Sequence, residues 1–354
     1  MRVFESDVVI VGAGIMGAAT ARALSKSGLT VNILEQFEPG HTNGSSHGTS
    51  RIFRLSYPDA MYVSMAQEAL TLWREAEEET GESLLVTTGG FDTGEGIEAN
   101  ADALEECGAE FEMVKEADVV DRWPQVRLGP DEVALWQPDA GVALADQTLA
   151  AFLRVAKHGG VRLYDNTRVE SLELSEDGVQ VHARGKTFHG GVVIVTSGGW
   201  AAPLLATAGV TLDVKPTRET VSYFSIKESA PTFVEWRGVG SARSQDDGPS
   251  IYALPAPGFG LKAGEHIAGP PTDPDRPGEV NLESVERISA WVADRFPGAD
   301  PTPAHAETCI YTNTPDEHFV LERHGPIVVG SPCSGHGFKF APLIGKRLAQ
   351  LATR

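Results

Sequence analysis

The first thirty-five residues alternate between apolar runs and small residues in a way that predicts an α/β core. The segment Val3–Val11 ends in a continuous apolar run, and a glycine turn and a stretch of small residues follow it. A second apolar run covers Leu29–Leu34. This order is typical of a strand, a tight turn, a helix and a second strand.

Helical and strand-like patterns recur along the rest of the chain. Apolar spacing predicts helices over residues 60–80, over Ile97–Cys107 and from Thr148 to about His158. Residues 159–196 alternate like antiparallel strands and end in a buried strand, Val192–Thr196. The last segment predicts a strand, a glycine turn and a helix with one apolar face, formed by Phe340, Leu343, Ile344, Arg347, Leu348 and Leu351.

These changes of pattern predict two domains in a chain of 354 residues. The βα segments at both ends and in the middle form one domain, which we expect to comprise residues 1–84, 146–214 and 316–354. Two β-rich insertions, residues 85–145 and 215–315, form the other. A chain of this length buries a large core without disulfides.

Charge and composition narrow the class of protein. The formal net charge is −20, and so acidic a surface repels nucleic acid and anionic lipid. The sequence has neither an apolar run of about 18 residues nor a signal-peptide pattern at its start. Its three cysteines are too widely spaced for a disulfide framework or a CxxC metal pair. We therefore expect a cytoplasmic protein without a metal site.

The motif GAGIMG at residues 12–17 follows the first strand and opens the first helix. A dinucleotide needs a tight turn, close backbone approach and a helix N-terminus facing its pyrophosphate, and Gly12, Gly14 and Gly17 supply these. Glu35 ends the next strand, where a carboxylate holds ribose hydroxyls and repels a 2′-phosphate. The motif therefore favours a dinucleotide site over a glycine turn that serves only close packing. Together with Glu35 it favours FAD or NAD, and the choice between these two cofactors stays open.

A basic cluster interrupts this acidic chain. His47, Arg51 and Arg54 lie within eight residues, and no acidic residue occurs between His41 and Tyr57. Two interpretations account for the cluster. It is either a solvated loop, or an anion site in which an arginine forks onto a substrate carboxylate.

Three later motifs each have a structural and a chemical interpretation. Lys262, in the glycine-rich segment GLKAGEH, is either a lysine at a sheet edge or a buried functional cation. Cys309, in CIYTNTPDEHF, is by itself a buried thiol. The motif SGHGFKF at residues 334–340 is either a glycine-rich turn or a helix start that stabilises an anion.

Taken in order, these segments resemble the monomeric sarcosine oxidase and N-methyltryptophan oxidase family of covalent-FAD amine oxidases. The resemblance covers nearly the whole chain, through the N-terminal glycine turn and the segments HGTSRIFR, VVIVTSGGW, GLKAGEH, CIYTNTPDEHF and SGHGFKF. It implies an α/β fold with a Rossmann-like FAD-binding domain and a discontinuous β-rich substrate domain of the D-amino-acid-oxidase and sarcosine-oxidase type.

The resemblance also implies roles for individual residues. Cys309 matches the cysteine that forms a thioether to FAD, Lys262 the lysine that activates dioxygen, and Arg51 an arginine beside the flavin ring. Arg54 and Lys339 match the pair that holds the substrate carboxylate. Further residues expected around the substrate and the flavin are Tyr252, His266, Tyr311, His47 and His336. The cofactor contacts expected besides Cys309 are Gly12, Gly14, Gly17, Glu35, Gly335 and Gly337.

The implied activity is the oxidation of a small secondary amino acid, with dioxygen as acceptor and an imine and hydrogen peroxide as products. Sarcosine is the first choice of substrate, ahead of L-proline, pipecolate or a bulkier N-methyl amino acid. A flavin dehydrogenase using an electron carrier and a non-catalytic FAD-binding subunit are the remaining alternatives. We expect a monomer. The chain ends 14 residues after SGHGFKF, and residues 235–250 depart from the family pattern, which leaves the edge of the substrate domain open.

Overall fold

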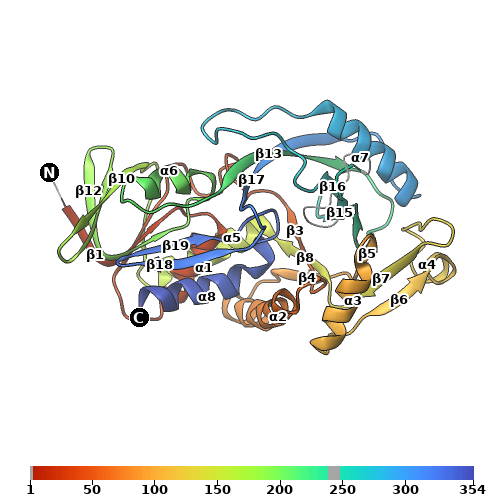
Figure 1. Ribbon diagram of the computed structural model, residues 1–354, viewed down its shortest axis with the longest axis horizontal. Coiled ribbons are helices and arrows are strands. Elements are labelled where there is room, and N and C mark those ends of the chain that lie inside the picture. The colour runs from red at the N-terminus through yellow and green to blue at the C-terminus, as the bar shows by residue number, and fades with distance from the viewer. Residues whose placement is uncertain (1–2, 238–247) are drawn as a thin grey trace.

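The fold consists of two large sheets at opposite ends of an elongated molecule, with a small sheet between them (Figure 1). It is a computed structural model, and the description covers residues 3–237 and 248–354. The predicted departure at residues 235–250 therefore lies mostly outside the described residues. In the part of the chain that is described, no helix combines the length and apolarity needed to cross a bilayer.

The first sheet has eight strands and a parallel centre. Its strands are β1 (Val3–Val11), β2 (Val31–Leu34), β9 (Arg162–Tyr164), β10 (Val169–Ser175), β11 (Gly178–Ala183), β12 (Lys186–Val195), β18 (Val320–His324) and β19 (Ile327–Ser331). Their order is β10-β11-β12-β1-β2-β9, with β19 paired to β12 and β18 paired to β19. β1 runs parallel to both β2 and β12. A parallel centre must be covered on both faces, which explains the apolar runs in the sequence.

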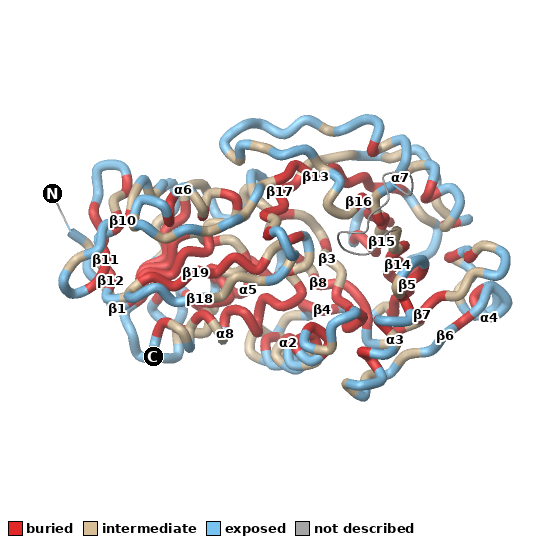
Figure 2. The backbone as a smooth tube through the Cα atoms, viewed as in Figure 1, coloured by how far each residue is buried: buried red, intermediate tan, exposed pale blue. Residues whose placement is uncertain are grey.

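Helices cover the two faces of this sheet. They are α1 (Ile15–Leu24), α2 (Ala60–Thr80), α5 (Ala145–His158), α6 (Ala201–Ala206) and α8 (Ala341–Ala352). Val8 and Ile10 of β1 belong to the core beneath α1 and α8, whereas Val9 and Val11 belong to the core beneath α6. Figure 2 shows this buried centre as a continuous band along β1, β12 and β19.

The second sheet gathers both β-rich insertions. Its strands are β5 (Gly90–Gly94), β6 (Glu112–Lys115), β7 (Val133–Gln137), β13 (Lys215–Phe224), β14 (Thr232–Trp236), β15 (Ile251–Ala256), β16 (Gly260–Glu265) and β17 (His305–Asn313), in the order β17-β13-β16-β15-β14-β5-β7-β6. The parallel pairing of β14 with β5 joins the two insertions. The accompanying helices are α3 (Ile97–Glu106), α4 (Glu116–Arg122) and α7 (Leu282–Arg295).

A three-stranded sheet connects the two halves. It consists of β3 (Ser50–Phe53), β8 (Gly141–Leu144) and β4 (Leu85–Thr87), with β8 in the centre. The strand β3 carries part of the predicted basic cluster, so this cluster lies between the large sheets rather than on a freely solvated loop. The predicted limits of the two domains stay a prediction.

The structure confirms the predicted α/β class and moves several element boundaries. β2 begins at Val31, two residues later than expected, because the backbone and hydroxyl of Thr30 both donate to the Asp7 carboxylate. α5 begins at Ala145, before the expected Thr148. Phe340 lies in a 3₁₀ turn, Phe338–Phe340, that precedes α8.

Candidate active site

The glycine turn between β1 and α1 is as tight as its sequence requires. Gly12 has φ = +100°, and a Cβ atom placed on Gly17 would lie 1.9 Å from the Gly12 carbonyl oxygen. The Ile15 amide at the start of α1 donates to the Ser46 hydroxyl at 2.9 Å. The helix N-terminus therefore faces a polar loop, where its partial positive charge suits a pyrophosphate.

Glu35 is fixed beside this turn. One carboxylate oxygen accepts from the Ala13 amide at 2.8 Å and the other from the Phe37 amide at 3.0 Å. Burial disfavours the charged carboxylate, but the His41 side chain and the two amides outweigh this effect and lower the pKa of Glu35. An ionised carboxylate in this position can accept hydrogen bonds from ribose hydroxyls.

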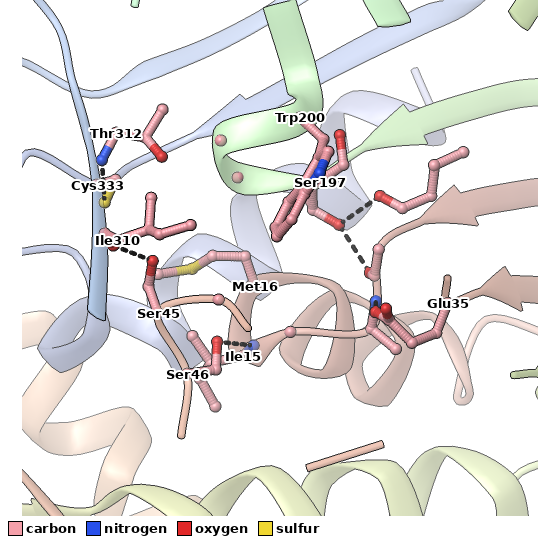
Figure 3. Close-up of a pocket in the computed structure, with 18 of the residues that line it drawn as sticks. Ile15, Met16, Glu35, Ser45, Ser46, Ser197, Trp200, Ile310, Thr312 and Cys333 are labelled. Carbon is pink, nitrogen blue, oxygen red and sulfur yellow. Dashed lines mark hydrogen bonds between the residues drawn. The ribbon is translucent and has the colours of Figure 1, made fainter. Parts of the chain in front are cut away.

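A cavity of about 450 Å³ runs from Glu35 and the glycine turn toward the second sheet. In Figure 3, Glu35, Ser197 and Trp200 surround one end of it, and Ile310, Thr312 and Cys333 lie at the other. The sequence-predicted residues that line it are Gly12, Gly14, Glu35, Arg51, Tyr311, Gly335 and Gly337.

Unsatisfied polar groups in the cavity wall indicate a polar occupant. The hydroxyls of Ser197, Thr312 and Ser331 are buried and line the cavity, yet they have no hydrogen-bond partner among the described residues. Buried hydroxyls are normally paired, so a ligand with polar groups along its length would complete them. Together with the glycine turn and Glu35, this wall fits FAD.

Lys262 lies in the centre of the second sheet, on β16, and only 4% of its surface is exposed. Its Nζ atom lies 5.4 Å from the centroid of the Tyr223 ring. Burial, and after it the positive charge of Arg51, lower the pKa of Lys262 to about 7. The sequence alternative of a lysine at a sheet edge is therefore wrong, because β15 and β13 flank β16 on either side.

Two further predicted residues lie near Lys262: Arg51 on β3, and His47 in the loop that precedes β3. The Arg51 guanidinium donates to the carbonyl oxygens of Ser50, Ser45 and His47 at 2.6 to 2.9 Å. His47 is buried, and its Nε2 atom has no partner among the described residues. Burial and the nearby Arg51 lower the pKa of His47 to about 4, so its ring is neutral at pH 7.

Cys309 lies on β17, opposite Glu219 of β13, and is 8% exposed. Burial raises the pKa of its thiol. Its neighbours Ile310 and Tyr311 line the cavity, whereas Cys309 itself lies just behind the wall. Cys333 lines the cavity directly, and its sulfur accepts from the Thr312 amide at 3.2 Å. Two thiols therefore lie near the same end of the cavity.

Arg54 is held between two aromatic rings. Its guanidinium carbon lies 4.3 Å from the centroid of Tyr57 and 4.8 Å from that of Trp236. The side chain is buried, and Nη1 has no hydrogen-bond partner among the described residues. Stacking fixes the orientation of the guanidinium while leaving this donor available to an anion.

Lys339 and His336 lie on the other side of Tyr57. The Lys339 ammonium donates to the Tyr57 hydroxyl at 2.9 Å and to the His336 carbonyl at 3.0 Å. The Tyr57 hydroxyl also lies 3.2 Å from His336 Nδ1. Burial, followed by the charge of Arg54, lowers the pKa of Lys339 well below its ordinary value. An anion bound near both cations would relieve their mutual repulsion.

The remaining predicted residues connect the two groups of cations. Tyr252 and Tyr311 are joined by a side-chain hydrogen bond. The His266 ring lies 6.0 Å from that of Tyr311 and 6.2 Å from that of Trp236, centroid to centroid. The structure thus brings the catalytic and substrate-binding candidates into one neighbourhood between the cofactor cavity and the second sheet; their individual roles stay predictions.

Sequence reasoning missed three residues that surround Arg54: Tyr57, Asp92 and Trp236. Tyr57 is the last residue of the segment that carries the basic cluster, and this position in the sequence could have indicated it. Asp92 and Trp236 had no such signal, because they meet only through the pairing of β5 with β14, where Trp236 Nε1 donates to Asp92 Oδ1 at 2.7 Å.

Comparison with known proteins agrees with this geometry. The family model for FAD dependent oxidoreductases matches residues 7–351. Monomeric sarcosine oxidase of Arthrobacter is 32% identical over 98% of this chain and 92% of its own length. Peroxisomal sarcosine oxidase of Mus musculus is 34% identical with the same coverage. The solved structure of NikD, an unusual amino acid oxidase essential for nikkomycin biosynthesis, has a TM-score of 0.88 at 27% identity and covers 99% of this chain and 94% of that one.

The chain therefore belongs to the FAD dependent oxidoreductase family. Its similarity to sarcosine oxidases over almost its whole length makes it, more specifically, a flavin-dependent amine oxidase. The predicted family resemblance, fold and enzyme class are confirmed.

Proposed function

We propose that this enzyme oxidises a small secondary amino acid, with sarcosine as the first choice, and reduces dioxygen to hydrogen peroxide. The observation that carries the proposal is the Arg54 guanidinium, buried between two rings, whose Nη1 has no hydrogen-bond partner among the described residues. Such a group binds a carboxylate strongly, because little water shields it. Lys339 lies so close to Arg54 that the arginine charge adds to burial in lowering the pKa of Lys339. Its ammonium would hold the second oxygen of the substrate carboxylate.

The surrounding residues orient the substrate and exclude water. FAD, when bound, supplies the two-electron acceptor for the hydride from the carbon attached to the substrate nitrogen. Arg54 and Lys339 would fix the carboxylate, so that this carbon takes one position. The rings of Trp236 and Tyr311 lie on either side of His266, at 6.2 and 6.0 Å between centroids, and Trp236 stacks on Arg54, so these rings would border the bound substrate.

Two further assignments belong to this proposal. Cys309 would hold FAD through a thioether; the support is that its chain neighbours Ile310 and Tyr311 line the cofactor cavity. Lys262 would place a positive charge where dioxygen is reduced, and its burial makes that charge effective. We also propose that the enzyme is a monomer, as the name of the Arthrobacter relative suggests; a cytoplasmic location stays a prediction.

Anaerobic mixing of the purified holoenzyme with sarcosine tests the proposal. Loss of the visible flavin band within seconds, followed by its return together with hydrogen peroxide when air is admitted, is the expected result. A band that persists would refute sarcosine and direct the search to L-proline, pipecolate and bulkier N-methyl amino acids. Reduced flavin that persists in air would instead indicate a dehydrogenase that uses an electron carrier.

A further inference from the structure

A second cavity, of about 640 Å³, adjoins the cofactor cavity, and its wall includes Tyr223, whose ring centroid lies 5.4 Å from Lys262 Nζ. The two cavities share Pro39, Gly40 and Leu149 in their walls. The second cavity is lined by polar groups that the proposed reaction has not yet used: Asp146, Tyr223, His305 and Glu307, together with the predicted His47. His305 and Asp146 are exposed, so this cavity meets solvent.

Glu307 and Tyr223 form the centre of this wall. The Tyr223 hydroxyl donates to Glu307 Oε1 at 2.6 Å. Tyr223 lies directly opposite Lys262 in the pairing of β13 with β16. At Gly48, where φ is +100°, a Cβ atom would lie 3.4 Å from Arg51 Nη1 and 3.7 Å from Glu307 Oε1. The carboxylate of Glu307 therefore reaches the neighbourhood of Arg51, and through the Tyr223 ring that of Lys262.

Several charged or titratable groups face Lys262 from the elements around it. They are Arg51 and His47 from β3 and its preceding loop, Asp146 from α5, Tyr223 from β13, and Glu307 and Cys309 from β17. His47 is neutral at pH 7 and Tyr223 is neutral throughout the ordinary range, because burial lowers the pKa of the first and raises that of the second. The charge of Lys262 is therefore set by one cation, Arg51, and by carboxylates.

The groups that favour charged Lys262 differ in kind and position. Burial and Arg51 disfavour the ammonium form of Lys262, whereas Cys309, Glu307 and, less strongly, Asp146 favour it. Glu307 is itself ionised: its burial is outweighed by the Tyr223 hydrogen bond and the nearby Lys262, which lower its pKa. Asp146 is tied to the Gly48 amide at 2.8 Å and burial raises its pKa. Because burial raises the pKa of the Cys309 thiol, this group is neutral at pH 7, and Glu307 is the main ionised counter-charge.

We propose that Glu307 is a positioning residue that keeps Lys262 protonated, and that the second cavity supplies solvent protons to this lysine. The role in catalysis rests on the proposed function. Reduction of dioxygen to hydrogen peroxide takes two electrons, which come from the amino acid, and two protons. The Lys262 ammonium stabilises the negative charge that dioxygen acquires, and a proton given up there is replaced through the second cavity.

A pH titration of the oxidised holoenzyme without substrate tests the proposal. The visible flavin absorbance is recorded between pH 5 and 10, and the midpoint that disappears in Lys262→Met belongs to Lys262. Glu307→Gln should lower this midpoint by about one pH unit, because an opposite charge nearby has been removed. Glu307→Asp should restore most of the shift, and Tyr223→Phe, which keeps the carboxylate, should change it little.

Glu322→Gln is the matched control, since Glu322 is an exposed carboxylate of β18, in the first sheet, and does not line the second cavity. A midpoint that is the same in Glu307→Gln as in the parent, or the absence of any Lys262-dependent midpoint, would overturn the proposal. Thermal unfolding of each variant separates a titration effect from misfolding.

A second measurement distinguishes this proposal from the proposed function. The holoenzyme is reduced with dithionite and mixed with aerated buffer at pH 8, where Glu307→Gln should reoxidise about tenfold more slowly than the parent if one pH unit is lost. An enzyme that titrates as expected but is reduced by no secondary amino acid would refute the proposed substrate class alone. Equal reoxidation rates in parent and variant would refute the role of Glu307.

Discussion

Arg54 and Asp92 lie side by side, with 3.8 Å between Nη1 and Oδ1, and do not hydrogen-bond to each other. Asp92 instead accepts from Trp236 Nε1 and from Ser56. Burial raises the pKa of Asp92, although Arg54 counteracts this rise. The nearby Asp92 carboxylate compensates part of the charge of Arg54. Because its hydrogen bonds are with Trp236 and Ser56, it leaves the Arg54 Nη1 donor available to a substrate.

Exchange of Arg54 for an acid should therefore abolish carboxylate binding. In Arg54→Glu we expect the dissociation constant of a small carboxylate inhibitor to rise by more than about 100-fold, since a charged hydrogen bond is lost and a repulsion gained. Arg54→Lys should lose less, and Arg347→Glu, at a half-exposed position of α8 that pairs with Glu68, should lose nothing. Titration of the flavin spectrum with inhibitor measures all three; unchanged affinity in Arg54→Glu would refute the carboxylate site.

Neutralising Lys262 should affect one half-reaction. A unit charge about 4 Å from a developing anion contributes roughly 4 kcal/mol at an effective dielectric constant near 20, or on the order of 10³-fold in rate. Stopped-flow spectroscopy of Lys262→Met should show reoxidation slowed to about this extent and flavin reduction little changed. Lys262→Arg, which keeps the charge, should lie between. Equal losses in both half-reactions would contradict the assignment.

The same lysine should cost the protein stability. Its pKa is about 7 in the folded protein against an ordinary value of 10.5, so between these two values the unfolded chain binds more protons than the folded one. Stability then rises with pH across this window, and the cost of Lys262 is greatest below pH 7. Lys262→Met should raise Tm by a few degrees at pH 6 and by less at pH 9. A Tm lowered equally at both values would contradict this result.

The two cysteines at the end of the cofactor cavity should behave differently. If Cys309 carries the thioether, Cys309→Ser should release yellow flavin into the supernatant after acid precipitation, whereas the parent keeps it in the pellet. Cys333→Ser is the matched control, because its sulfur lines the cavity directly and forms only the hydrogen bond from Thr312. Release by Cys333→Ser instead would assign the attachment to Cys333, in the loop that follows β19, and refute Cys309.

The glycine turn should tolerate no side chain at its third glycine. In Gly17→Ala the new Cβ atom would meet the Gly12 carbonyl at 1.9 Å, so the turn must open and FAD content should fall severely, together with a loss of several degrees in Tm. Gly298→Ala provides the comparison, since the nearest atom there lies 3.9 Å away. The ratio of flavin to protein absorbance measures the outcome; normal loading of Gly17→Ala would argue against this geometry.

The sequence predicted the parts of the site that depend on local spacing. Gly12, Gly17 and Glu35 are linked by a single strand-turn-helix-strand unit, whose pattern is legible without any distant contact. Glu307 and Asp92 were missed for the opposite reason. An acidic residue on a strand acquires a role only when a partner strand sets its neighbour, and these partners are more than 80 residues away along the chain.

The cofactor cavity has walls from nearly the full length of the chain, from Val11 to Phe338. No fragment that stops before Phe338 can therefore present the complete binding surface, and the parallel pairing of β5 with β14 adds another contact of high sequence separation. Such contacts close slowly during folding. We therefore expect FAD to bind late, after nearly the whole chain has left the ribosome. A shortage of FAD in the cell would then leave full-length chains with an incomplete, cofactor-free binding surface.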